Sequence, residues 1–179
     1  MQGFPKLSLV TGGAASGKSR LAERLVDVSG RRKVYIATAQ AFDAEMEIKI
    51  ARHRNDRGAL WRTIEAPLNL AEALDDPWSD EIILIDCLTM WLSNHLLAES
   101  DLGEQITALL AQLDALTVPV VLVTNEVGSS VVPQNPLARR FQSEQGHLNQ
   151  RMAARADLVV AVMAGLPLVL KGDLPGDLT

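Results

Sequence analysis

The sequence lacks the features that mark secreted and membrane-spanning proteins. Cys87 is the single cysteine, so no disulfide can form within the chain, and a reducing compartment is the default expectation. The apolar runs at residues 118–123 and 158–164 are far shorter than a bilayer span. The first residues contain no long apolar stretch of the signal-peptide kind. We therefore expect a cytoplasmic protein with no membrane span.

A surplus of basic residues is also missing. The formal net charge is −5, which argues against general nucleic-acid binding, because such domains are normally basic. The chain has 179 residues, 47% hydrophobic and 22% charged, which is typical of one globular domain with a sizeable core. No internal repeat is visible. We expect a single domain over residues 1–172 and a loose tail over residues 173–179.

Short apolar runs alternate with segments of helical spacing. The runs predict strands at residues 6–11, 34–37, 61–64, 81–86 and 119–124. The spaced segments predict helices at residues 19–28, 43–53, 69–74, 88–97, 102–116 and 137–156. Residues 158–170, broken by Gly165 and Pro167, predict two strands in a terminal hairpin. This pattern indicates a three-layer α/β fold with a mostly parallel sheet and an antiparallel C-terminal edge strand.

Residues 12–19 fit the phosphate-binding pattern G-x-x-x-x-G-K-[S/T] at every fixed position. Small residues let the backbone curl so that its N–H groups point at phosphate oxygens. The lysine reaches the β and γ phosphates, and the last serine offers a hydroxyl to Mg²⁺. A glycine-rich turn before an ordinary helix is the alternative. The predicted nucleotide-binding residues are Gly12, Gly13, Ala14, Ala15, Ser16, Gly17, Lys18 and Ser19, with Lys18 also catalytic and Ser19 a metal ligand.

Two predicted strands end in acidic residues. Asp86 follows an apolar run, where an acid is costly unless it faces a cation or hydrogen-bond donors. It is the expected second anchor for the metal, usually through a water, although it could instead cap the next helix. Glu126 and Asn125 also end a buried strand, at the edge where open α/β sheets bind ligands. They could hold a hydroxyl, a water or the acceptor substrate, or simply stabilise a turn.

A positive patch surrounds His53. Residues 49–62 contain five basic residues and one acid in a chain of negative net charge. Nearby cations disfavour imidazolium, so His53 should be neutral and nucleophilic. Arginines here could clamp a triphosphate, and a neutral imidazole at an α-phosphate could form a covalent nucleotide intermediate. A solvated helix face with an incidental histidine is the alternative. His95, His147 and Cys87 have no comparable surroundings and are expected to be structural.

Several motifs together resemble the bifunctional adenosylcobinamide kinase/adenosylcobinamide-phosphate guanylyltransferase family of cobalamin biosynthesis. The resemblance extends from Leu7 to about Lys171. The segments that carry it are TGGAASGKSR (11–20), YIATA (35–39), RH (52–53), WRTIE (61–65), DCLTMWL (86–92), TNEVG (124–128), VP (132–133), LAR (137–139) and GHLNQ (146–150). Ala15 stands where the family commonly has arginine, so a side-chain contact from that position is lost.

The resemblance implies more than the motifs establish on their own. Such enzymes phosphorylate adenosylcobinamide with ATP or GTP and then transfer GMP from GTP to that phosphate, through a guanylylated histidine. The matching histidine here is His53. The resemblance also implies a RecA-like P-loop fold, Mg²⁺ with the nucleotide, and a homotrimer. Further nucleotide-binding positions would be Thr38, Ala39, Gln40, Arg54, Arg57, Glu65 and Asp86; the roles of Glu126 and Arg139 stay unassigned.

Two other functions fit the same motifs. A monofunctional small-molecule kinase would use the P-loop and leave His53 structural. A P-loop regulatory protein would use nucleotide to control the binding of a partner and would turn over no cobinamide. The first of these should release no pyrophosphate from GTP.

Overall fold

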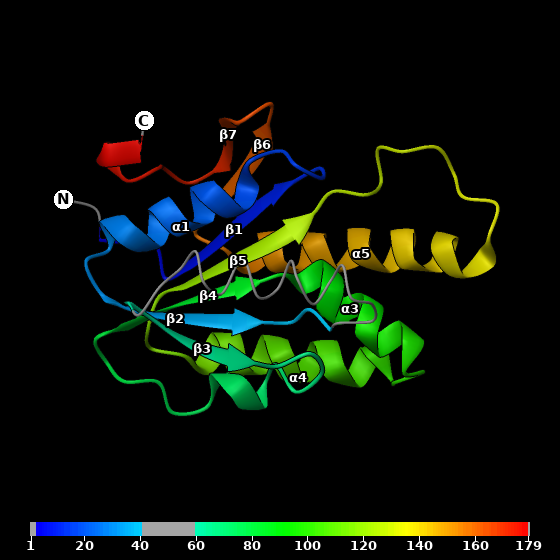
Figure 1. The fold of residues 1–179 in the computed structure, drawn as a ribbon, viewed down its shortest axis with the longest axis horizontal. Coiled ribbons are helices and arrows are strands. Elements are labelled where there is room, and N and C mark those ends of the chain that lie inside the picture. Colours follow the sequence, from blue (N-terminus) through cyan, green and yellow to red (C-terminus); the bar gives the residue numbers. More distant parts are fainter. Residues whose placement is uncertain (1–2, 41–59, 179) are drawn as a thin grey trace.

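Strands and helices alternate in the computed structural model, which describes residues 3–40 and 60–178. Figure 1 shows a central sheet with helices packed on it. Within the described residues the strands are β1 (Leu7–Gly12), β2 (Arg32–Ala37), β3 (Trp61–Glu65), β4 (Glu81–Asp86), β5 (Val120–Asn125), β6 (Leu158–Met163) and β7 (Leu166–Lys171). The α-helices there are α1 (Lys18–Val28), α3 (Leu88–Leu97), α4 (Leu102–Ala115) and α5 (Pro136–Arg155). Short 3-10 helices are η2 (Glu72–Leu74) and η3 (Gly176–Leu178).

The strands are ordered β3-β2-β4-β5-β1-β6-β7 across the sheet. All neighbours pair in parallel except β6 and β7, which are antiparallel. The predicted fold class, with a mostly parallel sheet and an antiparallel C-terminal edge strand, is therefore confirmed. Because the parallel strands run in one direction, their carboxyl ends meet at one edge, where ligands bind in open α/β folds.

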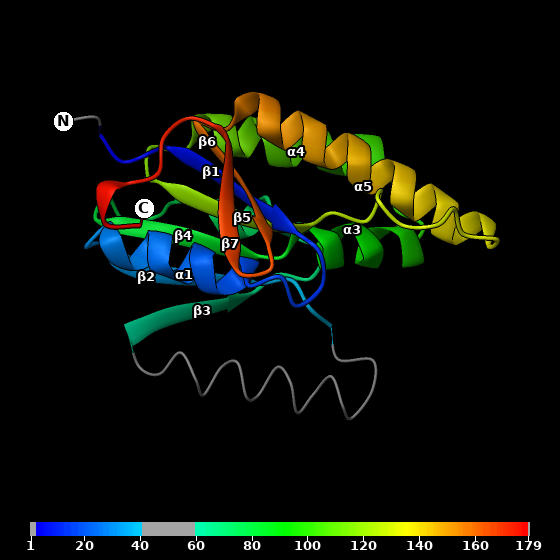
Figure 2. The same ribbon diagram turned by 90° about the horizontal axis from the view of Figure 1, so that it is seen from above.

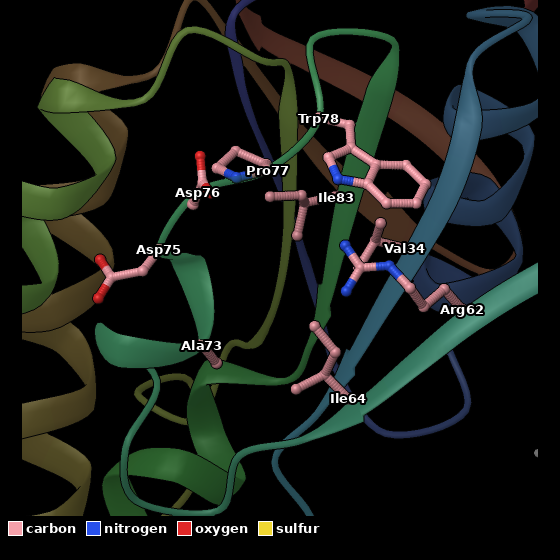
Figure 3. Close-up of a pocket in the computed structure, with 9 residues that line it drawn as sticks. All are labelled: Val34, Arg62, Ile64, Ala73, Asp75, Asp76, Pro77, Trp78 and Ile83. Carbon is pink, nitrogen blue, oxygen red and sulfur yellow. The ribbon is translucent and has the colours of Figure 1, made fainter.

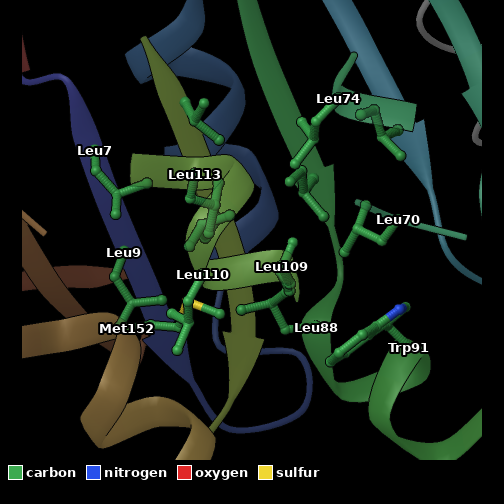
Figure 4. Packing of buried hydrophobic residues seen from close by; sticks show 14 of the residues in the cluster. Leu7, Leu9, Leu70, Leu74, Leu88, Trp91, Leu109, Leu110, Leu113 and Met152 are labelled. Carbon is green, nitrogen blue, oxygen red and sulfur yellow. The ribbon is translucent and has the colours of Figure 1, made fainter. Parts of the chain in front are cut away.

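The sheet buries apolar side chains on both faces, which explains why its central strands are apolar throughout. Figure 2 shows α4 and α5 on one side of the sheet and α1 on the other. The larger cluster joins α3, α4 and α5 to strand residues such as Leu9 and Ile85; Figure 4 shows part of it. The smaller cluster joins α1 to the alternate residues of the same strands, among them Val10 and Leu84. Strand β1, which leads into the P-loop, is thus held between two packed layers.

Two segments differ from the sequence prediction. The expected helix at residues 69–74 is reduced to η2, because side chains of α3 bind the carbonyls that precede it. Asn94 donates to Pro67 O, and the Trp91 indole donates to Leu68 O. The C-terminal segment, expected to be loose, is anchored by one residue: Leu178 in η3 is 4% exposed and belongs to the α1-side cluster.

Candidate active site

The P-loop connects β1 directly to α1, as the motif requires. Its backbone includes two left-handed residues, Ala15 at φ 55° and Gly17 at φ 94°. Gly17 occupies the N-cap of α1, and no side chain caps this helix end. The first N–H groups of α1 are therefore available to an anion, and the helix dipole favours negative charge there. Helix starts of this kind can bind phosphate oxygens, so the geometry is compatible with the predicted role of the loop.

Gly12 has no room for a side chain. A Cβ at this position would lie 2.6 Å from the Ser16 hydroxyl and 2.6 Å from the Val162 carbonyl oxygen of β6. The Ser16 hydroxyl itself is buried and has no hydrogen-bond partner within the described residues. Only glycine lets the chain turn from β1 into the loop this close to β6.

Lys18 lies across the loop that precedes it. Its ammonium group donates a hydrogen bond to the carbonyl oxygen of Gly13 at 3.0 Å. The lysine side chain thus folds back over residues 13–18 instead of extending to solvent. A P-loop lysine contacts the β and γ phosphates, and this role for Lys18 stays a prediction.

Asp86 ends β4 with its carboxylate half-buried at the ligand-binding edge of the sheet. The Tyr35 hydroxyl donates to its Oδ2 at 3.0 Å. The alternative role as a helix cap is not observed, since Cys87 occupies the N-cap of α3 and no side chain caps it. Strand β5 lies between β4 and β1, so Asp86 is one strand further from the P-loop than a direct neighbour would be. The Asp86 carboxylate is therefore oriented by the Tyr35 hydroxyl and does not cap a helix.

Cys87 is packed rather than reactive. The residue is 9% exposed, and burial, with the neighbouring Asp86 charge, raises the pKa of its thiol to about 11. The thiol therefore stays protonated near neutral pH, whereas the reactive form of cysteine is the thiolate. The sequence-based expectation of a structural Cys87 agrees with this environment.

The strand register aligns several predicted site residues along one edge. Ala37 of β2 lies between Glu65 of β3 and Asp86 of β4, and all three are in register. Gly12 of β1 pairs with Asn125 of β5 in the same way. Glu65 is exposed at the end of β3, which is an edge strand. The sheet thus brings the two acids and the start of the P-loop to the same edge.

Thr38, Ala39 and Gln40 follow β2 at this edge. The Thr38 side chain is fully buried: its hydroxyl donates to Cys87 O at 2.6 Å and accepts from Cys87 N at 2.8 Å. This hydroxyl joins β2 to the start of α3 and faces no open space. Ala39 and Gln40 are half-buried. A nucleotide contact at these three positions stays a prediction, and at Thr38 this conformation leaves the hydroxyl no part in it.

Glu126 and Asn125 occupy the end of β5 beside the P-loop. The Glu126 amide donates to Gly12 O at 3.1 Å, and its carboxylate accepts from the Gly128 amide at 2.6 Å. The turn-stabilising interpretation of Glu126 is therefore observed. Asn125 differs, because its side-chain oxygen is buried and has no hydrogen-bond partner among the described residues.

A buried amide network behind this turn was not found by sequence reasoning. Gln145 donates to Thr124 Oγ1 and to Asn149 Oδ1, both at 2.9 Å, and Asn149 donates to the backbone oxygen of Asn125 at 3.1 Å. The i, i+4 spacing of Gln145 and Asn149 on α5 is the signal that could have indicated it.

Arg139, left unassigned above, donates hydrogen bonds to Pro133 O and Gln134 O and so stabilises the loop before α5.

The basic patch is only partly within the described residues. His53, Arg54 and Arg57 lie outside them. Arg62, from the same patch, forms a bidentate ion pair with Glu81, whose side chain is 1% exposed. Because its guanidinium is held at the start of β4, Arg62 does not contribute to a triphosphate clamp in this structure.

His95 is buried on α3, and its pKa is lowered by burial, in keeping with the structural role expected for it.

A separate cavity of about 140 Å³ opens on the α4-side face, near the amino end of β4. Figure 3 shows Trp78, Arg62 and Ile64 around it, with Asp75 and Asp76 on the opposite rim. Its lining comes from β2, β3, the segment before β4 and the first half of β4, whereas the P-loop follows the carboxyl end of β1. The cavity is therefore not part of the candidate active site.

Among the side chains of residues 3–40 and 60–178, no group of three or more His, Cys, Asp or Glu could hold a metal ion. None of the helices in this part of the chain has the length and apolarity to span a bilayer.

Comparison with known proteins agrees with the geometry. The cobinamide kinase / cobinamide phosphate guanyltransferase family model matches residues 8–170. The bifunctional adenosylcobalamin biosynthesis protein CobP of Pseudomonas aeruginosa is 49% identical over 168 residues, covering 92% of this chain and 97% of its own. The CobU protein of Salmonella typhimurium is 40% identical, covering 91% and 98%.

Solved structures show the same fold at low sequence identity. The flagellar accessory protein FlaH of Methanocaldococcus jannaschii has a TM-score of 0.53 at 14% identity, covering 96% of this chain and 81% of its own. Protein PH0250 of Pyrococcus horikoshii has a TM-score of 0.55 at 10% identity, covering 97% and 89%. These likenesses concern the fold alone. The family match and the two sequence relatives decide the identity: the chain belongs to the cobinamide kinase / cobinamide phosphate guanyltransferase family.

Proposed function

We propose that this protein phosphorylates adenosylcobinamide with ATP or GTP and then transfers GMP from GTP to the new phosphate, giving adenosylcobinamide-GDP. The observation that carries the proposal is the uncapped P-loop between β1 and α1, with Lys18 folded over it. The substrates are inferred from the family to which the chain belongs. Both reactions move phosphorus groups of a nucleotide, and one loop can hold the triphosphate for each.

In the kinase reaction the chain mainly positions and neutralises charge. The substrate hydroxyl oxygen bonds to the γ-phosphorus, the bond to the β–γ bridging oxygen breaks, and the nucleoside diphosphate leaves as the hydroxyl proton is released. The loop amides hold the phosphates, and Lys18 stabilises the charge on the transferred group. Little more is needed from the protein, because phosphoryl transfer depends on alignment and electrostatics.

Ser19 and Asp86 are the residues that would hold Mg²⁺ with the nucleotide. Ser19 lies in the first turn of α1, and Asp86 presents a half-buried carboxylate that the fold does not use as a cap. An oxygen-only pair of this kind suits a hard cation that keeps several waters. When bound, the ion neutralises charge on the β and γ phosphates.

For the nucleotidyl transfer we propose His53 as the nucleophile. Its imidazole nitrogen bonds to the α-phosphorus of GTP, and pyrophosphate leaves. A phosphate oxygen of adenosylcobinamide phosphate then bonds to the same phosphorus, the P–N bond breaks, and His53 is regenerated. Arg54 and Arg57 would neutralise the developing charge. The proposal rests on the family resemblance and on the basic residues around His53 in the sequence.

Covalent labelling tests this assignment. With GTP radiolabelled in its α-phosphate, the parent protein should acquire an acid-labile, alkali-stable label typical of a phosphoramidate. His53→Ala should abolish the label and retain kinase activity, whereas His147→Ala, an exposed change on α5, should label normally. Equal labelling of the His53→Ala protein would refute the assignment.

Product analysis separates the two other functions. Incubation with GTP, Mg²⁺ and adenosylcobinamide should give adenosylcobinamide-GDP and pyrophosphate, identified by mass spectrometry. A monofunctional kinase would stop at adenosylcobinamide phosphate. A regulatory P-loop protein would give neither product.

We further propose a cytoplasmic homotrimer, as the family resemblance implies. The single buried cysteine fits a reducing compartment. The β6–β7 hairpin carries exposed apolar side chains suited to a contact between copies, namely Met163, Leu166, Leu168, Val169 and Leu170. Light scattering coupled to size-exclusion chromatography should give three times the chain mass, and Leu168→Glu should reduce it. A monomeric parent protein would exclude the trimer.

A further inference from the structure

The turn between β6 and β7 contacts the P-loop. Strand β6 pairs in parallel with β1, with Val162 opposite Gly12, so the hairpin turn lies at the same edge as the loop. Met163 pairs with Leu166, and the two residues between them, Ala164 and Gly165, have φ angles of 52° and 79°. This is the left-handed backbone of a tight two-residue hairpin turn.

Gly165 is hydrogen-bonded to the loop itself. Its amide donates to the carbonyl oxygen of Ser16 at 2.9 Å. A Cβ built on Gly17 would lie 3.4 Å from the Gly165 Cα and 3.8 Å from Val162 Cγ1. The hairpin therefore packs directly against the glycine that precedes the catalytic lysine.

The bond fixes the direction of a second amide. A trans peptide is planar, so the N–H of Gly17 points opposite to the C=O of Ser16. Since that carbonyl faces Gly165, the Gly17 N–H faces away from the hairpin. Amides of this part of a P-loop are the ones that cradle phosphate oxygens.

We propose that Gly165 is a positioning residue for the nucleotide: its amide locks the Ser16–Gly17 peptide so that the Gly17 N–H is directed at the bound phosphates. This inference rests on the proposed nucleotide binding by the P-loop. It assigns the C-terminal hairpin a part in nucleotide affinity, although this hairpin is distant in sequence from the motif and contributes no group to it.

Two substitutions at Gly165 separate turn geometry from side-chain bulk. Asparagine tolerates a positive φ, whereas valine is strained there. A Cβ at position 165 would come no closer than 3.7 Å to its nearest neighbour, Arg20 Nη2. The site therefore has room for a Cβ, and any loss in the valine variant comes from backbone strain. Gly165→Val should raise the Kd for magnesium-loaded GTP about tenfold, equivalent to about 1.4 kcal/mol, and Gly165→Asn should stay near the parent.

Gly30 provides a matched control. It also has a positive φ, 65°, and a Cβ there would meet nothing within 4 Å. It follows α1 at the end remote from the P-loop. Gly30→Val therefore introduces the same kind of backbone strain and lowers Tm without changing the Kd for GTP. Isothermal titration calorimetry and thermal unfolding of all four proteins supply the comparison.

The outcomes are distinguishable. If the parent protein binds no nucleotide, the proposed function fails. If the parent binds but Gly165→Val binds equally well, or Gly165→Asn is impaired as much as Gly165→Val, the inference fails alone. Should Gly165→Val not fold, hydrogen exchange on the parent decides: the Gly165 amide should be protected, more so with GTP bound. Exchange at the rate of an open turn would overturn the inference.

Discussion

The Tyr35 hydroxyl donates a hydrogen bond to the Asp86 carboxylate at 3.0 Å, joining the middle of β2 to the end of β4. Tyr35 is 6% exposed, and its ring packs edge-on against Trp61. A buried phenol thus orients a carboxylate at the carboxyl edge of the sheet. This bond connects the core beneath α1 to the proposed metal site.

Removal of that hydroxyl should slow the kinase reaction. In Tyr35→Phe the carboxylate of Asp86 loses a donor while the ring still packs, so we expect kcat to fall several-fold and stability to fall by about 1 kcal/mol. Steady-state kinetics and urea unfolding measure the two effects. An unchanged kcat would show that Asp86 needs no such orientation.

Lys18→Ala should abolish phosphoryl transfer and weaken nucleotide binding. The lysine is the cation folded over the loop, and its loss leaves the β and γ phosphates without that charge. We expect a loss in kcat/KM of at least about a hundredfold, equivalent to about 2.7 kcal/mol. Lys171→Ala, which removes an exposed lysine at the end of β7, is the control and should retain activity. Full turnover by the Lys18→Ala protein would refute the P-loop assignment.

Arg62→Ala should destabilise the protein and leave nucleotide affinity unchanged. The substitution strands the Glu81 carboxylate, 1% exposed, without its bidentate partner, although Trp78 N still donates to it. Because the Arg62 side chain is 49% exposed, water can partly replace it, and we expect a loss of about 2 kcal/mol. Chemical unfolding and GTP titration measure the two quantities. Weaker GTP binding with unchanged stability would place Arg62 in the phosphate clamp after all.

Cys87 should make the protein less stable in alkali. Burial raises the pKa of its thiol from 9.0 to about 11. Below about pH 9 the thiol is protonated in both the folded and the unfolded protein, so its contribution to the free energy of unfolding is fully present. As pH rises from there to about 11, the unfolded thiol ionises before the folded one, and up to about 3 kcal/mol of stability is lost. Unfolding free energies measured against pH should show this decline in the parent and a shallower one in Cys87→Ala. Parallel curves would contradict the raised pKa.

The elements that position the site could be predicted because their residues are locally decisive. The strand ending at Gly12, the helix beginning at Lys18 and the strand ending at Asp86 agree with their predicted bounds within a residue. The two strands combine an apolar run with a clear stop, a glycine or a carboxylate, and the helix has apolar residues at helical spacing. Their parallel arrangement followed from strands apolar on both faces.

What could not be predicted depends on contacts between distant segments. Nothing local to Asn69 shows that α3 side chains bind the nearby carbonyls and shorten the helix there. The Arg62–Glu81 pair joins residues that are 19 apart in sequence, and the contact of Gly165 with Ser16 joins opposite ends of the chain. For Thr38, the family resemblance implied a nucleotide contact but not that its hydroxyl would bond to Cys87.

The burial of Leu178 against the α1 side of the sheet has a practical consequence. A stop codon or fused tag placed after residue 172, where the sequence suggests a boundary, would remove or displace Leu178 from its packing against α1, the helix that begins with Lys18. Burial of a leucine is worth about 1.5–3 kcal/mol, so such truncated proteins should melt earlier and confuse affinity measurements. Expression designs for nucleotide studies should keep η3 intact and place added sequence beyond it.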